Sequence, residues 1–254
     1  MHIVQLSSAL IDYSMNTFCF MSWCMSLEVN KNIQDTIFTC DLNQVASYLC
    51  KKNKNLKQII PQLPDIKLKK PKHADPFWAL LRSIVYQQLS GHVAQVILQR
   101  FLELVAVPPH ASNASQAAQK IRTLSEQECR QVGLSGSKIK AIYDLAEHAV
   151  SLRLPSVRQM NTWSDDLIIK QLTAVHGVGP WTVQMYLIFT LGRINVWPCA
   201  DFGIQKGFMY LDGLDAHPNA KHLASQMERF TPYCSVASLY LWKIADLHKS
   251  FKIL

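Results

Sequence analysis

Charge is scarce in this sequence. Only 17% of the 254 residues are Asp, Glu, Lys or Arg, whereas 49% are apolar. A chain with so little charge and so much apolar material is neither disordered nor fibrous. Its length allows one large domain or two small ones, with a substantial buried core.

The seven cysteines lack any metal-binding or redox pattern. No two are spaced as C-x-x-C, no histidine lies at zinc-finger spacing from a cysteine pair, and no tight run is suited to an iron–sulfur cluster. Their number is odd and they are scattered along the chain. They are typical of reduced, mostly buried thiols in a reducing compartment.

A long hydrophobic run is also missing. The most apolar N-terminal stretch, residues 11–27, is interrupted by polar residues that include Asp12, Ser14, Asn16 and Ser22, and it has no basic segment before it. This pattern argues against a signal peptide and against a membrane span. Residues 1–40 then form an N-terminal extension for which three readings stay open: a packed helix, a lipid-leaning segment, or residues upstream of a later start methionine.

Acidic residues are outnumbered, because 18 Asp and Glu face 26 Lys and Arg, which gives a net charge of +8. Such an excess suggests a polyanionic partner, such as nucleic acid or an anionic membrane. Eight of the lysines lie within residues 51–72, where Asp65 is the single acid. Three prolines in that stretch predict an extended connector rather than a helix. The connector is either a solvated linker or a contact to a phosphate backbone.

Strand patterns and internal repeats are absent, and the apolar residues from Asp75 onward recur at helical spacing instead. Asp75-Pro76 supplies an N-cap and a proline at the first helical position. Ser125-x-x-Glu128 is a capping box. The fold class is therefore all-α. Further helices are predicted at 41–50, after 90–91, from Ser137 onward, and at 165–173, 182–191, 217–230 and 235–248.

The most informative stretch is 172–182, LTAVHGVGPWT. One helix ends shortly before the Gly177-Val178-Gly179 turn, and Pro180 opens the next helix. Two glycines two residues apart permit positive φ and a close approach to the backbone. The free N–H groups at the new helix N-terminus can receive an anion such as a DNA phosphate. The same pattern also makes ordinary turns between helices.

Asp201 follows Gly179 by 22 residues, in an irregular segment. The hairpin, the Gly-Pro turn and the later aspartate together resemble the helix-hairpin-helix DNA glycosylase superfamily. Residues 177–182 (GVGPWT) and 196–205 (VWPCADFGIQ) are similar to its DNA-3-methyladenine glycosylase II group. Three more segments match motifs of that group in the same order, so the resemblance covers about residues 41–250. These segments are 75–90, 136–141 and 232–242.

The resemblance implies a two-lobed helical bundle with the active cleft between the lobes. One lobe, residues 75–192, would carry the hairpin. The other would combine residues 41–74 with 193–254 and carry Asp201. No cofactor is implied, and no catalytic metal. A monovalent cation held by the backbone of Val175 and Gly177 would be structural.

The resemblance also implies roles for single residues. Asp201 would stabilise the positive charge that develops on the sugar as the N-glycosidic bond breaks, or would activate the attacking water; a helix N-cap is the alternative. Trp181 and Trp242 would stack on a flipped cationic base. Met185 and Tyr240 are weaker pocket candidates, with core packing as the alternative. Trp181 stands where strand-cutting members carry a lysine, so the implied enzyme is a monofunctional hydrolase that leaves an abasic site.

The implied partner is double-stranded DNA with damaged bases, and the implied reaction is base excision repair of an alkylated purine of the 3-methyladenine type. We expect a monomer that does not bind a membrane. It would lie in the cytoplasm, associated with the nucleoid, if the protein is bacterial, and in the nucleus if it is eukaryotic. Two alternatives stay open: a non-catalytic helix-hairpin-helix DNA-binding module, and a glycosylase for a deaminated or oxidised base. The residues expected to contact DNA are Gly177, Val178, Gly179 and Thr182 of the hairpin, Lys138 at a helix start, and Gln88 or Leu89 as the wedge that fills the gap left by the flipped base.

Overall fold

The computed structural model describes residues 36–71 and 74–247. The apolar stretch 11–27, for which three readings were open, lies outside the described residues. Within them there is no strand, and the all-α prediction is confirmed. The elements in chain order are α2 (Leu42–Lys52), α3 (Lys54–Ile59), η1 (Ile60–Gln62), α4 (Pro76–Tyr86), α5 (Gly91–Val105), η2 (Ala111–Asn113), α6 (Ala114–Thr123), α7 (Glu126–Gln131), α8 (Gly136–Val150), α9 (Val157–Met160), α10 (Asp165–Leu172), α11 (Pro180–Tyr186), η3 (Leu187–Leu191), α12 (Phe202–Asp212), α13 (Ala220–Ser225), η4 (Met227–Arg229) and α14 (Cys234–Leu247).

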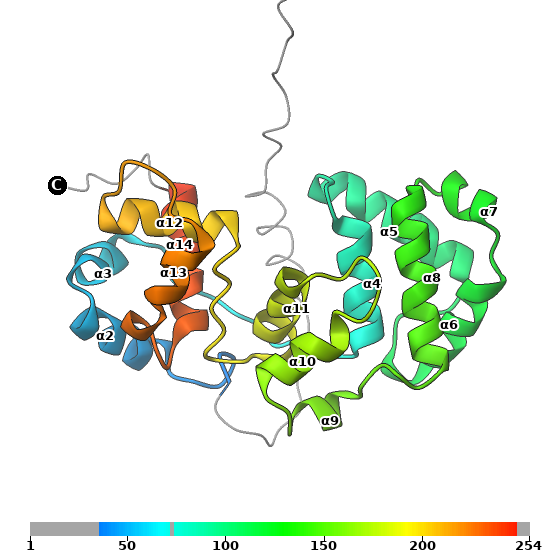
Figure 1. The fold of residues 1–254 in the computed structure, drawn as a ribbon, viewed down its shortest axis with the longest axis horizontal. Helices are drawn as coiled ribbons and strands as arrows, with labels where there is room; N and C mark the ends of the chain where they lie inside the picture. The colour runs from blue at the N-terminus through cyan, green and yellow to red at the C-terminus, as the bar shows by residue number, and fades with distance from the viewer. Residues whose placement is uncertain (1–35, 72–73, 248–254) are drawn as a thin grey trace, which may run out of the picture.

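The helices gather into two lobes that lie side by side (Figure 1). The first lobe holds α4 to α11, with α8 packed on α4 and α6. The second lobe holds α12 to α14 together with α2 and α3, so both ends of the described chain contribute to it. The boundaries at residues 75 and 192 stay a prediction.

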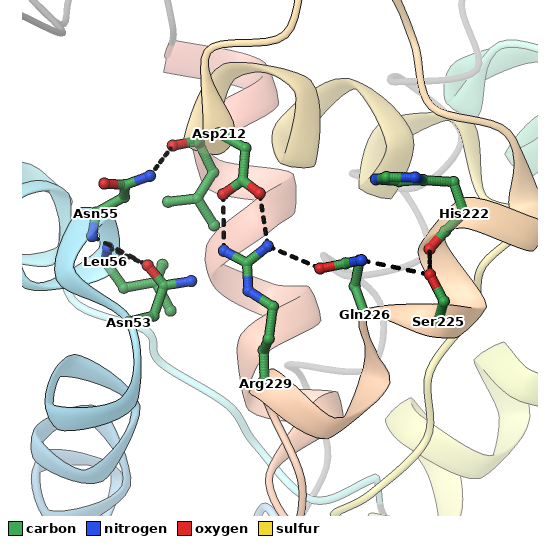
Figure 2. Close-up of polar contacts among 9 residues, drawn as sticks. Asn53, Asn55, Leu56, Asp212, His222, Ser225, Gln226 and Arg229 are labelled. Carbon is green, nitrogen blue, oxygen red and sulfur yellow. Dashed lines mark hydrogen bonds and ion pairs between the residues drawn. The ribbon is translucent and has the colours of Figure 1, made fainter.

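Contacts between distant parts of the sequence hold the second lobe together (Figure 2). The Asn55 side chain donates a hydrogen bond of 2.9 Å to the carbonyl oxygen of Leu211, near the end of α12. The Arg229 guanidinium donates to both carboxylate oxygens of Asp212, in one case at 2.8 Å, and lies 5.2 Å from the ring centre of Phe208. Bidentate pairs of this kind fix orientation as well as distance. They join α3 and η4 to the end of α12.

The lysine-rich segment is helical over its first half, so the predicted extended connector was wrong there. The Asn53 side chain caps α3 by accepting the Leu56 N–H at 3.1 Å, and both Leu56 and Ile59 are buried. Pro61 sits at the start of η1, where a missing N–H costs nothing. The cap and the buried apolar pair therefore outweigh the prolines, and in the described part of this segment the cap residue Asn53 and residues 63–71 lie outside a helix.

Two helix boundaries also differ from the sequence prediction. α8 starts at Gly136 rather than at Ser137, because Ser135 is its N-cap. The predicted helix 217–230 starts later and is divided. Asn219 is the N-cap of the short α13, which ends at Ser225, and the chain then forms the separate η4. The capping box of α7 and the Asp75 cap of α4 are confirmed.

α12 packs along α14 in the second lobe. The contact is close because Gly207 lies at the crossing: a Cβ atom there would be 2.0 Å from the carbonyl oxygen of Leu241. In the described part of the chain, no helix combines the length and the apolar character needed to cross a membrane. Five cysteines fall in the same part, all as free thiols, and Cys19 and Cys24 lie outside it.

Candidate active site

Asp201 is the N-cap of α12. Its Oδ1 accepts the backbone N–H of Ile204 at 2.8 Å, so the capping alternative describes part of what this side chain does. Capping uses only one of the lone pairs of the carboxylate, and both oxygens have further partners. The cap fixes the carboxylate at the point where the second lobe faces α11.

Two tryptophans from different lobes donate to this carboxylate. The Trp181 indole on α11 donates from Nε1 to Oδ2 at 2.6 Å, and the Trp242 indole on α14 donates to Oδ1 at 2.8 Å. Asp201 is only 2% exposed. The structure therefore brings together three residues that the sequence named separately, from α11, α12 and α14.

Burial and hydrogen bonding act in opposite directions on Asp201. Burial raises the pKa of the carboxyl group, whereas the N–H donors of Trp181, Ile204 and Trp242 favour the anion and lower the pKa. Burial is the larger effect, so the net shift is upward. The site is thus a buried carboxylate whose charge is held by fixed N–H dipoles rather than by a cation.

Gly203 makes the approach of Trp242 possible. A Cβ atom at this position would lie 2.7 Å from Cδ1 of Trp242 and 3.1 Å from Oδ1 of Asp201. A side chain here would displace either the indole or the carboxylate. The glycine in the sequence A-D-F-G is therefore part of the site.

The glycines of the hairpin have different tasks. Gly177 has φ +76° and packs on α8, because an added Cβ would lie 2.9 Å from Cβ of Ala141. Gly179 is the N-cap of α11 with φ −92°, and an added Cβ would meet nothing within 4 Å. Gly177 is needed for the turn, whereas Gly179 leaves open space beside the backbone. Val178 and Thr182 are buried, so their predicted contact with DNA would have to use backbone groups.

The turn between α4 and α5 separates the two wedge candidates. Gln87 is extended (φ −54°, ψ 130°), Gln88 has φ +56°, and the Leu89 N–H donates to the Tyr86 carbonyl at 3.4 Å, which is the pattern of a type II turn. Gln88 is exposed, whereas Leu89 is half-buried against the core. The assignment of the wedge stays a prediction, and exposure favours Gln88.

Lys138 is tied to the protein in the structure. Its Nζ donates to the carbonyl oxygen of Val85, in the last turn of α4, at 2.7 Å. The side chain is half-buried, and desolvation lowers its pKa to about 8. The predicted DNA contact of Lys138 stays a prediction, and the contact with α4 is a task that the sequence did not indicate.

Met185 and Tyr240 lie in the hydrophobic core, with 1% and 7% of their surface exposed. Burial raises the pKa of the Tyr240 hydroxyl. The alternative of core packing thus describes both side chains in this structure, and their role in a pocket stays a prediction.

Sequence reasoning missed Phe202, the residue that follows Asp201. Its ring is 42% exposed and stacks on the His217 imidazole, with centres 4.7 Å apart and planes at 14°. An exposed aromatic beside a buried carboxylate can offer its face to a base. An aromatic residue directly after the aspartate was a signal that the sequence contained.

The predicted cation site would use the backbone carbonyl groups of Val175 and Gly177, each of which already accepts one hydrogen bond. The Val175 carbonyl accepts the Val178 N–H at 3.1 Å, and the Gly177 carbonyl accepts the Gln87 side-chain amide at 2.9 Å. Each carbonyl keeps a second lone pair, so the donor set remains compatible with a monovalent cation. Among the described residues, no three His, Cys, Asp or Glu side chains lie together in a group suited to a metal ion.

A helical fold with a Gly-Pro hairpin facing a buried aspartate is the arrangement of one class of DNA repair proteins. The model of the HhH-GPD superfamily of base excision DNA repair proteins matches residues 81–232. This chain belongs to that superfamily.

Relatives within the superfamily carry alkylation-repair names. The chain is 32% identical over 175 residues to DNA-3-methyladenine glycosylase 1 of Schizosaccharomyces pombe, covering 68% of this chain and 74% of that protein. The solved structure of 3-methyladenine DNA glycosylase Mag1 from the same organism, in complex with abasic DNA, superposes with a TM-score of 0.69 at 27% identity, over 82% of this chain and all of that one. The solved structure of a DNA-3-methyladenine glycosidase from Bacillus halodurans superposes with a TM-score of 0.70 at 30% identity. The superposition covers 81% of this chain and 91% of that one.

Proposed function

We propose that this protein is a monofunctional DNA glycosylase of base excision repair, which extrudes an alkylated purine of the 3-methyladenine type and hydrolyses its N-glycosidic bond. The names of its relatives support this substrate class. The observation that carries the proposal is the Asp201 carboxylate, buried and held between the indoles of Trp181 and Trp242.

The chemistry follows from the charge that develops during the reaction. Cleavage of the N-glycosidic bond leaves an oxocarbenium-like sugar, which a nearby anion stabilises. The base departs with the bonding electrons, which neutralise its positive charge; water then adds to the sugar carbon and gives up one proton to Asp201 or to solvent. Asp201 supplies the anion. Asp201 is 2% exposed and the half-buried Trp181 indole lies beside its Oδ2, so the sugar would approach the carboxylate next to this indole.

The duplex partner is part of the same proposal. A base in the stack is out of reach of the carboxylate, so the enzyme must flip it out and hold the backbone meanwhile. The backbone N–H groups around Gly179 are suited to a phosphate, and Gln88 is suited to fill the gap. We infer a monomer that acts where the genome is, in the nucleoid of a bacterium or in a eukaryotic nucleus.

The absence of strand cleavage rests on Trp181. Lyase activity needs an amine that attacks the sugar and forms a Schiff base, and an indole cannot do this. Trp181 donates its only N–H to Asp201. Its position therefore supports hydrolysis and an abasic product with an intact strand.

The test is base release from DNA treated with dimethyl sulfate. The wild-type protein should liberate 3-methyladenine and leave abasic sites that break only on heating or in alkali. Asp201→Asn should lower the rate by about 100-fold or more, the scale of losing one electrostatic transition-state contact. Asp246→Asn, the same change at an exposed position of α14, should leave the rate within twofold.

Other outcomes would contradict specific parts of the proposal. Equal release by wild type and Asp201→Asn would remove Asp201 from the chemistry. Duplex binding without release from methylated, deaminated or oxidised DNA would identify a DNA-binding module. Release from deaminated or oxidised DNA alone would change the substrate class, and strand breaks without heat or alkali would contradict the Trp181 argument.

A further inference from the structure

Three polar contacts connect the turn after α4, helix α8 and the hairpin. The Gln87 side chain donates from Nε2 to the carbonyl oxygen of Gly177 at 2.9 Å. The backbone N–H of His176 donates to Oδ2 of Asp144, on α8, at 2.7 Å. Lys138 closes the set through its bond to the end of α4. Each of the three segments is thus bonded to both of the others, and we call this set the polar triangle.

The triangle uses backbone groups that have no partner within their own helix. The Val85 carbonyl lies in the last turn of α4, where the helix itself no longer supplies an N–H donor four residues further on. The hairpin groups of His176 and Gly177 lie between α10 and α11. All three bonds therefore fix the relative positions of separate segments rather than extend a helix. His148 lies beside the Asp144 corner, because its Nδ1 is 2.9 Å from the carbonyl oxygen of Asp144 and 3.4 Å from its Oδ2.

The corners of the triangle carry the residues proposed to contact DNA. Gln88 follows Gln87 directly, and Gly179 lies two residues after Gly177. Gln88 is exposed in a left-handed conformation that a non-glycine residue adopts only when its surroundings impose it. The bond from Gln87 to the hairpin and the bond from Lys138 to the end of α4 hold this turn from both sides.

We propose that Gln87 is a positioning residue, which couples the turn bearing Gln88 to the phosphate-binding hairpin through the carbonyl group of Gly177. This inference rests on the proposed function. The hairpin grips the backbone of the damaged strand while the turn enters the space vacated by the base. Gln87 sets the distance between the hairpin and the turn that bears Gln88.

A loss of this coupling has a distinctive consequence. Extruding a base from a stable stack needs the gap to be filled, whereas a base that has lost its partner is already cheap to extrude. A loosened turn therefore slows excision most when the damaged base is well paired. General damage to the fold would slow excision of paired and unpaired bases alike.

The variant Gln87→Met tests this, because methionine keeps the length of the side chain and removes the N–H donor. The matched control is Gln62→Met, since Gln62 donates from Nε2 to the Gln58 carbonyl at 2.9 Å in the second lobe. Gln87→Asn is a second variant, which keeps the amide but shortens its reach by one methylene group. Thermal unfolding of each variant establishes that it is folded.

The measurement is the single-turnover rate of base release from two duplexes that carry one 7-methylguanine. In one duplex the lesion faces cytosine, and in the other it faces a tetrahydrofuran abasic analogue. Both Gln87 variants should lose about five- to tenfold on the paired lesion, the scale of one hydrogen bond in an equilibrium. They should lose less than about twofold on the unpaired lesion. Gln62→Met should stay within twofold of wild type on both.

Equal losses on both duplexes would reduce Gln87 to a residue that only stabilises the fold. An unchanged rate on the paired lesion would show that the turn and the hairpin act independently, and either result overturns the inference. If the wild type releases no base from either duplex or from dimethyl sulfate-treated DNA, the proposed function itself fails. The two failures are therefore distinguishable.

Discussion

Burial and hydrogen bonding compete at Asp201, and the indoles of Trp181 and Trp242 decide how the competition affects catalysis. An N–H donor stabilises the carboxylate anion but leaves its net charge in place, whereas a cation would neutralise that charge. The carboxylate therefore keeps its full charge for the sugar. Gly203 belongs to the same arrangement, because its missing Cβ gives Trp242 room beside Oδ1.

We predict an acid limb in the pH dependence of base release. Burial raises the pKa of Asp201, and the reaction needs the anion. The rate should therefore fall as the pH drops through this raised pKa, approaching tenfold per pH unit below it. Single-turnover rates between pH 4.5 and 8 measure this, with circular dichroism at each pH to establish that the protein is folded. A rate that rises as the pH falls over this range, in a folded protein, would contradict the requirement for the anion.

At the scale of elements, the hairpin makes opposite demands on its two glycines. Gly177 combines a left-handed backbone with close packing on Ala141, whereas Gly179 has an ordinary φ and open space around it. Gly177 is therefore needed for folding, whereas Gly179 leaves the backbone accessible to a ligand.

We therefore predict that two identical substitutions separate stability from DNA binding. Gly177→Ala should lower the free energy of unfolding by about 1–3 kcal/mol, because it adds both backbone strain and overpacking. Gly179→Ala should leave the free energy of unfolding within about 0.5 kcal/mol but weaken binding to an abasic duplex, since its methyl group occupies the space of the phosphate. Urea unfolding and fluorescence anisotropy measure the two effects. Tight binding by Gly179→Ala would place the phosphate elsewhere.

The elements that the sequence could predict are those whose stabilising contacts are local. The Asp75 cap and the Ser125 capping box lie within one turn of the residues they serve, so the sequence pattern contains them. α3 was missed because part of its support comes from the bond between Asn55 and Leu211, 156 residues away. Local proline content could not reveal that contact.

The candidate site divides in the same way. The motif named Asp201, Trp181 and Trp242, because each stands at a characteristic place in the sequence. That both indoles donate to a single carboxylate could not be predicted, since it depends on how α11 and α14 meet α12. The bond from Gln87 to Gly177, across 90 residues, was hidden for the same reason.

At the scale of the whole molecule, the position of α2 and α3 bears on the two readings of residues 51–72, which are a solvated linker and a contact with a phosphate backbone. α2 and α3 lie at the outer edge of the second lobe, on the side away from α10 and α11 (Figure 1). Lys54 and Lys57 of α3 are exposed. This placement favours a solvated face for Lys54 and Lys57, whereas for Lys67, Lys69 and Lys70 both readings stay open.

We predict that Lys54→Gln and Lys57→Gln leave the salt dependence of DNA binding unchanged. Each lysine that touches a phosphate contributes about one to the slope of log K against log salt concentration. Lys170→Gln is the matched change on α10, just before the hairpin, and should lower the slope by about one. Anisotropy titrations from 50 to 300 mM salt measure this. A lower slope for the α3 variants would instead place DNA on that helix.

The chain order within the second lobe has a consequence for biosynthesis. α2 and α3 leave the ribosome before α4 to α11, whereas their partners α12 and α14 are synthesised after all of these helices. Domains generally fold as the chain emerges, N-terminal parts first. The lobe that carries the hairpin is therefore complete before the second lobe can close around Asp201. The nascent chain therefore forms the hairpin before the aspartate is enclosed, and α2 and α3 lack α12 and α14 as packing partners until these two helices have been synthesised.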